Sequence, residues 1–325
     1  MRALSFNQKK GLSYIGLLLV VVIWGICPLL SLELYEFYSP TFRPVLPLTI
    51  ITVVYLLMAR KQLPTFHRDY LKYGIPAGLF TGMGSIAQNI GLQYTTPSRY
   101  AFLENLSCLT VPIAMFFLVR KKPTLPTVLS CVACMISAFV LNGMGKEDSG
   151  AMWGIGEVLC SLAGLFYGLN IAVTGAYVKK MSVPLYLLVQ STVETLSHLA
   201  FSLVFHWVRI PVVGGGIAPI EQIKFSFEPK HIAYLIFVSL LASAFCWAIR
   251  AASMRYVDPA VVAVVMPFSA VITSVVSILL GKESLTFSLV VGGILGLVAI
   301  YLSSYEDIVA FWKHKKAEPK IRKEK

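Results

Sequence analysis

The chain has 325 residues, of which 57% are hydrophobic and 14% charged, and its formal net charge is +12. With a mean hydropathy of +0.74, it has too few polar side chains to cover a water-soluble surface of this length. This composition excludes a soluble globular protein and indicates a chain that is embedded in lipid.

Apolar stretches of about 20 residues, long enough to cross a bilayer as helices, recur along the chain. They predict an all-α membrane protein with ten transmembrane helices, at residues 12–32, 41–59, 71–92, 98–119, 125–143, 154–176, 184–206, 232–252, 259–280 and 284–305. The first span has basic flanks, as signal peptides do. It is too long for one and lacks a small-residue cleavage site, so we interpret it as a helix. The spans leave no soluble domain.

A pattern in the first half of the chain recurs in the second. Tyr94 to Pro97 (Tyr-Thr-Thr-Pro), followed by an apolar stretch, has its counterpart in Tyr256 to Pro259 (Tyr-Val-Asp-Pro), and Trp24-Gly25 has its counterpart in Tyr167-Gly168. Duplicated units with a binding site at their interface are typical of secondary transporters. We predict two five-helix repeats and a basic tail, at residues 1–147, 148–306 and 307–325.

The basic residues predict the orientation. Most of the 28 lysines and arginines fall in segments on the same side as the N-terminus, including the tail from Lys313. The positive-inside rule therefore places both termini in the cytoplasm, in a multi-pass protein of the inner (plasma) membrane. Five helices precede the second repeat, so it enters the bilayer from the opposite side and the repeat is inverted. The same distribution explains the net charge without a nucleic-acid partner, and the bilayer itself is the expected partner.

The predicted helix at 184–206 carries a polar stripe at helical spacing, made of Ser191, Glu194, Thr195, His198 and Ser202. Glu194 lies about ten residues into the helix, roughly 15 Å deep and near the midplane. On one interpretation, Glu194 binds a cationic group or carries a coupling proton, with His198 one turn away as its partner. On the other, the two residues form a hydrogen-bonded pair that only fixes helix packing. The sequence leaves both open.

Further cavity candidates follow from the repeat. Trp24 and Tyr167 occupy corresponding positions, as do Gln88 and Arg250. If Arg250 faces a cavity, it favours a substrate carboxylate or phosphate. Its sequence position slightly favours the alternative, in which it snorkels to the cytoplasmic surface. The full set of candidate cavity residues is Trp24, Gln88, Asn105, Tyr167, Asn170, Glu194, His198 and Arg250.

Signatures of enzymes, metals and cofactors are absent from the sequence. It contains no phosphate-cradling Walker motif, so we expect no nucleotide hydrolysis and no catalytic residues. The five histidines are too scattered for a metal site, and all six cysteines fall within apolar runs, which argues against a disulfide framework. We expect neither a metal nor a cofactor.

Several motifs keep a specific order and spacing across the predicted helices. They are Trp24-Gly25, Tyr94 to Pro97, Pro112, Gly156-Glu157, Met266-Pro267 and Gly281-Lys282-Glu283. In these motifs the chain resembles the drug/metabolite transporter superfamily, and within it the EamA-type permeases, over essentially its whole length. The resemblance implies a 5+5 inverted-repeat fold, with a central cavity lined by helices 1 to 4 and 6 to 9 and with helices 5 and 10 at the periphery.

The resemblance also implies export or exchange of small organic solutes such as amino acids, while other branches carry nucleotide sugars or phosphorylated metabolites. This chain departs from the pattern at Tyr167-Gly168, where the first repeat has Trp-Gly, and at Arg120 to Lys122, where the second repeat has a glycine-acid turn. The substrate class is therefore not carried over.

The sequence thus predicts a carrier that moves a small organic metabolite, an amino acid or a related solute, outward by alternating access. An ion-coupled importer or exchanger is the alternative within transport, and a non-transporting receptor or scaffold is the alternative outside it. Gly292 and Gly296 lie one turn apart in the last helix, where they favour either close packing or a homodimer face.

Overall fold

The computed structural model describes residues 6–34, 36–95, 100, 103–143, 154–211, 217–219, 225–280, 287, 290–302 and 305. Three features predicted from the sequence lie outside these residues: the Thr96-Pro97 pair, the glycine-acid turn at 281–283 and the basic tail.

Helical residues occur in every predicted span. The first half of the chain forms α1 (Phe6–Leu34), α2 (Val45–Ala59), η1 (Arg60–Thr65), α3 (Arg68–Gly91), η2 (Glu104–Leu106), α5 (Ser107–Val119) and α6 (Leu125–Gly143). The second half forms α7 (Ile155–Tyr177), η3 (Val178–Lys180), α8 (Val183–Trp207), α9 (Pro229–Ser239), η4 (Leu240–Phe245), α10 (Cys246–Ser253), α11 (Pro259–Val265), η5 (Met266–Phe268) and α12 (Ser269–Leu279), and a last helix spans Val290–Leu302.

The described chain is helical except for loops and one hairpin. Strand β1 (Arg209–Pro211) pairs antiparallel with β2 (Ile217–Pro219), and Arg209 stands opposite Pro219. The hairpin lies between α8 and α9, in the long segment that the sequence predicts as a loop. It is the one departure from the all-α expectation in the part of the chain that the structure describes.

Two spans predicted as continuous helices are interrupted. Between α9 and α10 the chain forms the π-helical turn η4, and between α11 and α12 it forms the 3-10 turn η5, which contains Pro267. Proline has no N–H to donate, so a regular helix cannot continue through it with all its hydrogen bonds. In η4 two carbonyls accept side-chain donors from other helices: Ala242 from Trp24 Nε1 and Ala244 from the Tyr55 hydroxyl, both at 2.7 Å.

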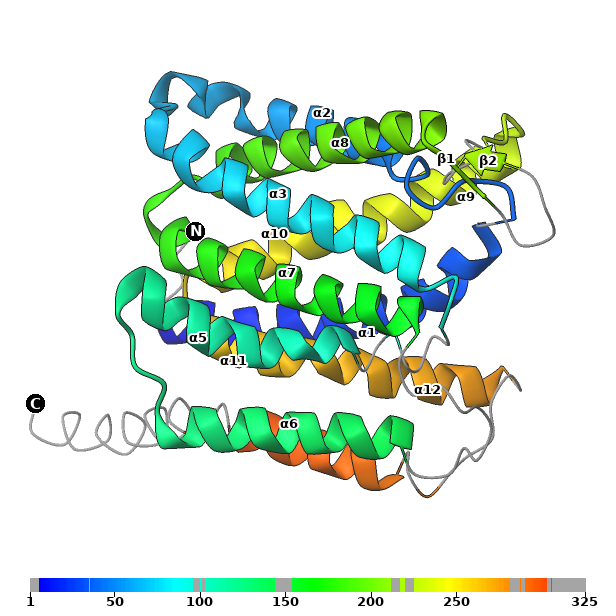
Figure 1. Ribbon diagram of the computed structural model, residues 1–325. Coiled ribbons are helices and arrows are strands. Elements are labelled where there is room, and N and C mark those ends of the chain that lie inside the picture. The colour runs from blue at the N-terminus through cyan, green and yellow to red at the C-terminus, as the bar shows by residue number, and fades with distance from the viewer. Residues whose placement is uncertain are drawn as a thin grey trace, which may run out of the picture.

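The helices lie side by side in one bundle, and the chain runs back and forth between its two ends (Figure 1). The hairpin lies at one end, and η1 lies at the other with the start of α1. Outward faces carry large exposed apolar side chains, among them Ile113, Phe117 and Phe139. Such a surface suits lipid rather than water.

Five of the described helical segments are long and apolar enough to cross a membrane: Phe6–Cys27, Val45–Thr65, Ile155–Lys180, Val183–Trp207 and Pro229–Ser253. Shorter apolar helices cover Ser107–Val119, Leu125–Ser137 and Val290–Leu302.

Glycines allow close contact between helices of the two halves. Gly74, Gly78 and Gly82 of α3 face α8, and a Cβ atom at Gly78 would lie 2.7 Å from the carbonyl oxygen of Gln190. The face of the last helix that carries Gly292 and Gly296 packs on α6, because the Ser137 hydroxyl donates to the carbonyl of Gly292 at 2.6 Å. This glycine face therefore packs within the chain, which is the first of the two alternatives that the sequence leaves open.

We predict that Gly78→Ala lowers the free energy of unfolding by about 1–3 kcal/mol, because the added methyl group meets backbone rather than a movable side chain. Thermal unfolding of the detergent-purified protein measures this change. Gly11→Ala is the matched control: Gly11 is an exposed residue of α1 whose Cβ would meet nothing within 4 Å. Equal melting temperatures of the two variants would contradict the close packing of α3 on α8.

Candidate functional site

A cavity of about 190 Å³ lies within the bundle. It is lined by residues of α1, α2, α3, η2, α5, α7, α8, α9, η4, α10, η5 and α12, and also by residues next to α2 and α3. None of the described lining residues comes from α6 or the last helix, which agrees with the peripheral place that the resemblance implies for helices 5 and 10. An engineered cavity of about 150 Å³ holds benzene, so this volume admits a small organic molecule.

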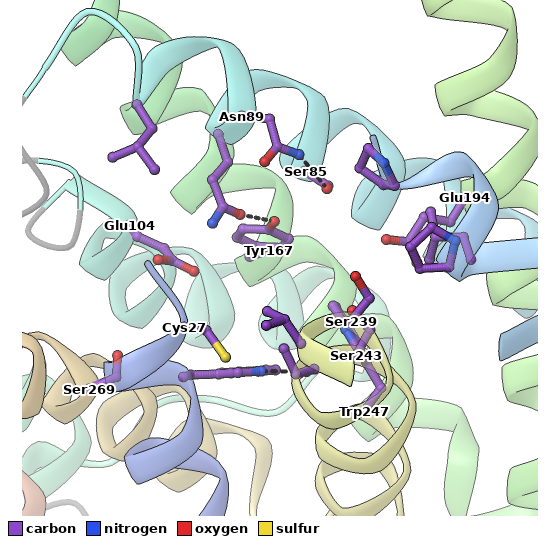
Figure 2. A pocket seen from close by; sticks show the side chains of 18 of the residues that line it. Cys27, Ser85, Asn89, Glu104, Tyr167, Glu194, Ser239, Ser243, Trp247 and Ser269 are labelled. Atoms are coloured by element: carbon purple, nitrogen blue, oxygen red, sulfur yellow. Dashed lines mark hydrogen bonds between the residues drawn. The ribbon is translucent and has the colours of Figure 1, made fainter. Parts of the chain in front are cut away.

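The structure brings most of the predicted site residues together. Trp24, Gln88, Tyr167, Glu194 and Arg250 line the cavity. Side chains from α3, α7 and η2 face those from α1, α9 and α10 across a common space (Figure 2).

Of the other three candidates, two do not line the cavity. Asn170 and His198 are fully buried. Asn105 belongs to η2, but its side chain lies outside the described residues.

The polar stripe on α8 is a buried face of that helix. Ser191 accepts a hydrogen bond from Thr52 of α2 at 3.0 Å, and Ser202 bonds Thr41 at 2.7 Å. Most of the stripe therefore fixes α2 and the residues before it against α8. Glu194 is the member of the stripe that lines the cavity.

Both ring nitrogens of His198 have partners other than Glu194. Nδ1 lies 2.8 Å from the carbonyl oxygen of Thr41, and Nε2 lies 3.1 Å from the hydroxyl of Ser85. A carbonyl can only accept, so Nδ1 donates, and in a neutral ring Nε2 accepts from Ser85. His198 therefore joins α8 to α3 and to the residues before α2.

Arg250 does not snorkel to the surface, which corrects the alternative that the sequence slightly favours. The side chain is only 2% exposed and lines the cavity. Its Nη2 donates to Oδ1 of Asn170 at 2.5 Å, and its Cζ lies 3.9 Å from the ring centroid of Trp247 and 5.5 Å from that of Trp24. Two indole faces and an amide oxygen replace the water that snorkelling would have supplied.

Trp247 connects the two aromatic residues that the repeat predicts as a pair. Its ring lies 5.9 Å from that of Trp24, at 62°, and 6.5 Å from that of Tyr167. The bond from Trp24 Nε1 to the carbonyl of Ala242 fixes the Trp24 indole. The cavity thus has an aromatic wall made by α1, α7 and α10.

A second wall is polar. Gln88 donates to the Tyr100 hydroxyl and accepts from the Tyr167 hydroxyl. Beside it, Arg43 donates to Oδ1 of Asn89 at 2.9 Å. Arg43 is thus part of the cavity wall.

Sequence reasoning missed Asn89 and Ser85 as lining residues. Asn89 directly follows Gln88 in an apolar helix, and Ser85 lies one turn earlier. Polar residues one turn apart on α3 are the signal that could have identified them.

The described lining residues carry two carboxylates, Glu104 and Glu194, and two guanidinium groups, Arg43 and Arg250. Both carboxylates are near enough to act electrostatically on Arg250. Among the described residues, neither lies within 4 Å of it as an ion pair, and the Arg250 Nε atom has no hydrogen-bond partner. The cavity therefore contains a buried cation without a direct counter-ion.

Contacts of helix ends and loops bridge the end of the bundle near η1. Tyr73 and Tyr177 stack at 3.6 Å, and the Tyr70 hydroxyl accepts from the backbone N–H of Ser182 at 2.9 Å. Lys121, after α5, forms an ion pair with Asp258, which also caps α11 through the N–H of Ala260. The Lys121–Asp258 pair thus joins the two halves of the chain.

The arrangement matches known proteins along most of the chain. The EamA-like transporter family matches residues 11–143 and again residues 154–305. An uncharacterized transporter of Archaeoglobus fulgidus is 23% identical over 296 residues, which cover 91% of this chain and 87% of that protein. A protein of known crystal structure, 12% identical, superposes with a TM-score of 0.69 over 91% of this chain and 97% of its own, which shows the fold alone.

The family match covers more than half of the chain and extends over both of its halves. It agrees with the apolar, multi-pass bundle and with the cavity inside it. The chain belongs to the EamA-like transporter family.

Proposed function

We propose that the chain is a secondary transporter that exports a small organic metabolite, an amino acid or a related solute, across the cytoplasmic membrane by alternating access. The observation that carries the proposal is a cavity whose wall is shared by helices of both halves and contains charged and aromatic side chains. A buried polar site at the interface of two repeats is how secondary transporters hold their cargo.

The proposal includes ten membrane-spanning helices in two inverted repeats, residues 1–147 and 148–306, with both termini cytoplasmic. Its support is that the same family matches the chain twice, once in each half. Corresponding positions of the repeat also meet at the cavity: Trp24 with Tyr167, and Gln88 with Arg250. The apolar outer faces and the lysine and arginine distribution fit this topology.

Alternating access is supported by the asymmetry of the bundle. The cavity reaches Leu34, the last residue of α1, and Leu92, which follows α3, so it extends toward the end opposite η1. The end near η1 is closed by the Lys121–Asp258 pair and the stacked tyrosines. We interpret this conformation as outward-facing, with the cytoplasmic end shut.

An ion-coupled importer or exchanger is the second candidate, and Glu194 favours it. A carboxylate buried in a cavity wall, without an ion pair among the described residues, is a candidate proton carrier.

The first experiment is accumulation of a pooled set of isotope-labelled metabolites in proteoliposomes that contain the purified protein, read against empty liposomes. Selective accumulation of one chemical class supports carriage. If correctly folded protein accumulates none, a receptor or scaffold role replaces the proposal.

We predict that Lys121→Met, and separately Asp258→Asn, open the cytoplasmic end more often and reduce outward exposure of the cavity. Asn at 258 retains the cap on α11, so only the charge is lost. A partly exposed ion pair contributes up to about 1 kcal/mol. This corresponds to a change of about two- to fivefold in the ratio of inward-facing to outward-facing protein. The reporter is Cys27, which lines the cavity, while the other five cysteines are buried.

An impermeant thiol reagent added from outside should therefore label Cys27 more slowly in these variants, by at most about fivefold. Cys27→Ser gives the background, and Lys122→Met is the matched control, because it removes a neighbouring exposed lysine outside the described pair. Faster labelling, or the same slowing in Lys122→Met, would show that the Lys121–Asp258 pair does not hold the cytoplasmic end shut.

We also predict that Glu194→Gln abolishes transport or removes its dependence on a pH gradient, because glutamine cannot exchange a proton. Glu157→Gln is the control: Glu157 is likewise buried but caps α7, where it accepts from Thr95 and from the N–H of Gly154. Uptake with and without an imposed gradient measures both variants. An unchanged rate and pH response in Glu194→Gln would rule out Glu194 as the coupling group.

A further inference from the structure

We propose that Arg250, which lies beside Trp24 and Trp247, is an anion-binding subsite that takes the single carboxylate of a small organic acid. The inference deepens the proposed function, on which it rests only in treating the bound acid as the transported solute. Its basis is the hydrogen-bond partners of the Arg250 guanidinium, its free N–H groups and the charged groups around it.

The first step is that Arg250 lacks a direct counter-ion. It is 2% exposed within an apolar bundle, where a charge is costly unless it is paired. Among the described residues it has one hydrogen bond, to Asn170, and its Nε is without a partner. Four of the five guanidinium N–H donors therefore have no protein acceptor there. Because Arg250 lines the cavity, a bound anion can supply one.

The second step is that the surroundings hold the guanidinium still. Asn170 donates through Nδ2 to the carbonyl of Ala77 at 3.0 Å, so its amide oxygen is turned toward Arg250. The Trp247 ring lies against the guanidinium, with 3.9 Å from Cζ to the ring centroid. The N–H groups point outward in the guanidinium plane, so a planar carboxylate meets the free ones edge-on with two parallel hydrogen bonds.

The third step limits the ligand to one negative charge. Glu194 and Glu104 line the same cavity and act electrostatically on Arg250. A second anionic group on the solute would meet either these carboxylates, which repel it, or Arg43, which already donates to Asn89 at 2.9 Å. Monocarboxylates, including zwitterions, are thus favoured over dicarboxylates and organic phosphates. The cavity of about 190 Å³ restricts them to small molecules.

Binding can be tested without transport, by thermal unfolding and tryptophan emission of the detergent-purified full chain. The probes are acid and amide pairs with the same carbon skeleton: acetate and acetamide, benzoate and benzamide, glycine and glycinamide, phenylalanine and phenylalaninamide. Succinate and phthalate serve as dianions. We expect at least one monocarboxylate to bind at least about tenfold more tightly than its amide and than the dianions, because only the monocarboxylate supplies one charge.

Variants assign the effect to the subsite. Arg250→Gln should abolish the preference for acid over amide, and Arg250→Lys, which keeps the charge but not the planar fork, should reduce it. Arg60→Gln, at an exposed position in η1 that does not line the cavity, should retain it. If Arg250→Gln does not fold, the acid and amide comparison on the unmodified protein and on Arg250→Lys still tests the subsite.

Three results would overturn the subsite: equal binding of acid and amide, undiminished acid binding in folded Arg250→Gln, or no binding of any monocarboxylate. Failure of the proposed function is distinct. If the protein binds carboxylates but carries no solute in proteoliposomes, the subsite stands and the transport proposal fails. If it carries only uncharged solutes, the transport proposal stands and the subsite fails.

Discussion

The buried guanidinium of Arg250 is the constraint on which the arrangement of the cavity depends. A charge that is almost fully buried inside a bundle with lipid-facing outer surfaces has to be compensated by neighbouring groups. Its compensation comes from three helices besides its own: Asn170 on α7, the indole of Trp24 on α1 and, at longer range, Glu194 on α8. One side chain therefore requires a fixed relation between helices of both halves.

Close packing of the helices fixes the positions of the groups that surround Arg250. The glycines of α3 bring its backbone against α8 at Gly78 and against α7 at Gly84, and the carbonyl of Ala77 on α3 orients Asn170 of α7. The π-helical turn η4 acts on the other side of the cavity, where its irregular backbone offers the carbonyl of Ala242 to Trp24. Irregular backbone at membrane depth is tolerated where side chains satisfy it or where it borders a cavity. Here it does both, since Ala242 also lines the cavity.

Local sequence patterns predicted much of this arrangement. Hydropathy located the helices, and the internal repeat indicated Trp24, Tyr167 and Gln88 as lining residues, because each signal lies within a short stretch of chain. The snorkelling alternative for Arg250 was wrong, because its burial depends on Trp24 and Asn170, which are distant in sequence. The bonds of His198 to Thr41 and Ser85, and that of Arg43 to Asn89, likewise depend on tertiary contacts that spacing does not reveal.

The same contacts indicate which parts could move against each other. Helices α2, α3, α7 and α8 pack together, whereas α1 packs on α10 and α12, so each group contains helices from both halves (Figure 1). The Arg250–Asn170 bond crosses between the groups inside the cavity. At the closed end, Arg255 after α10 crosses between them by donating to the carbonyls of Val178 and Met181. A carboxylate bound to the free N–H groups of Arg250 would share this guanidinium with Asn170, and so would act on the contact between the two groups at the point where cargo is held. In a transporter built this way, recognition of the anion and the change of access draw on one guanidinium group.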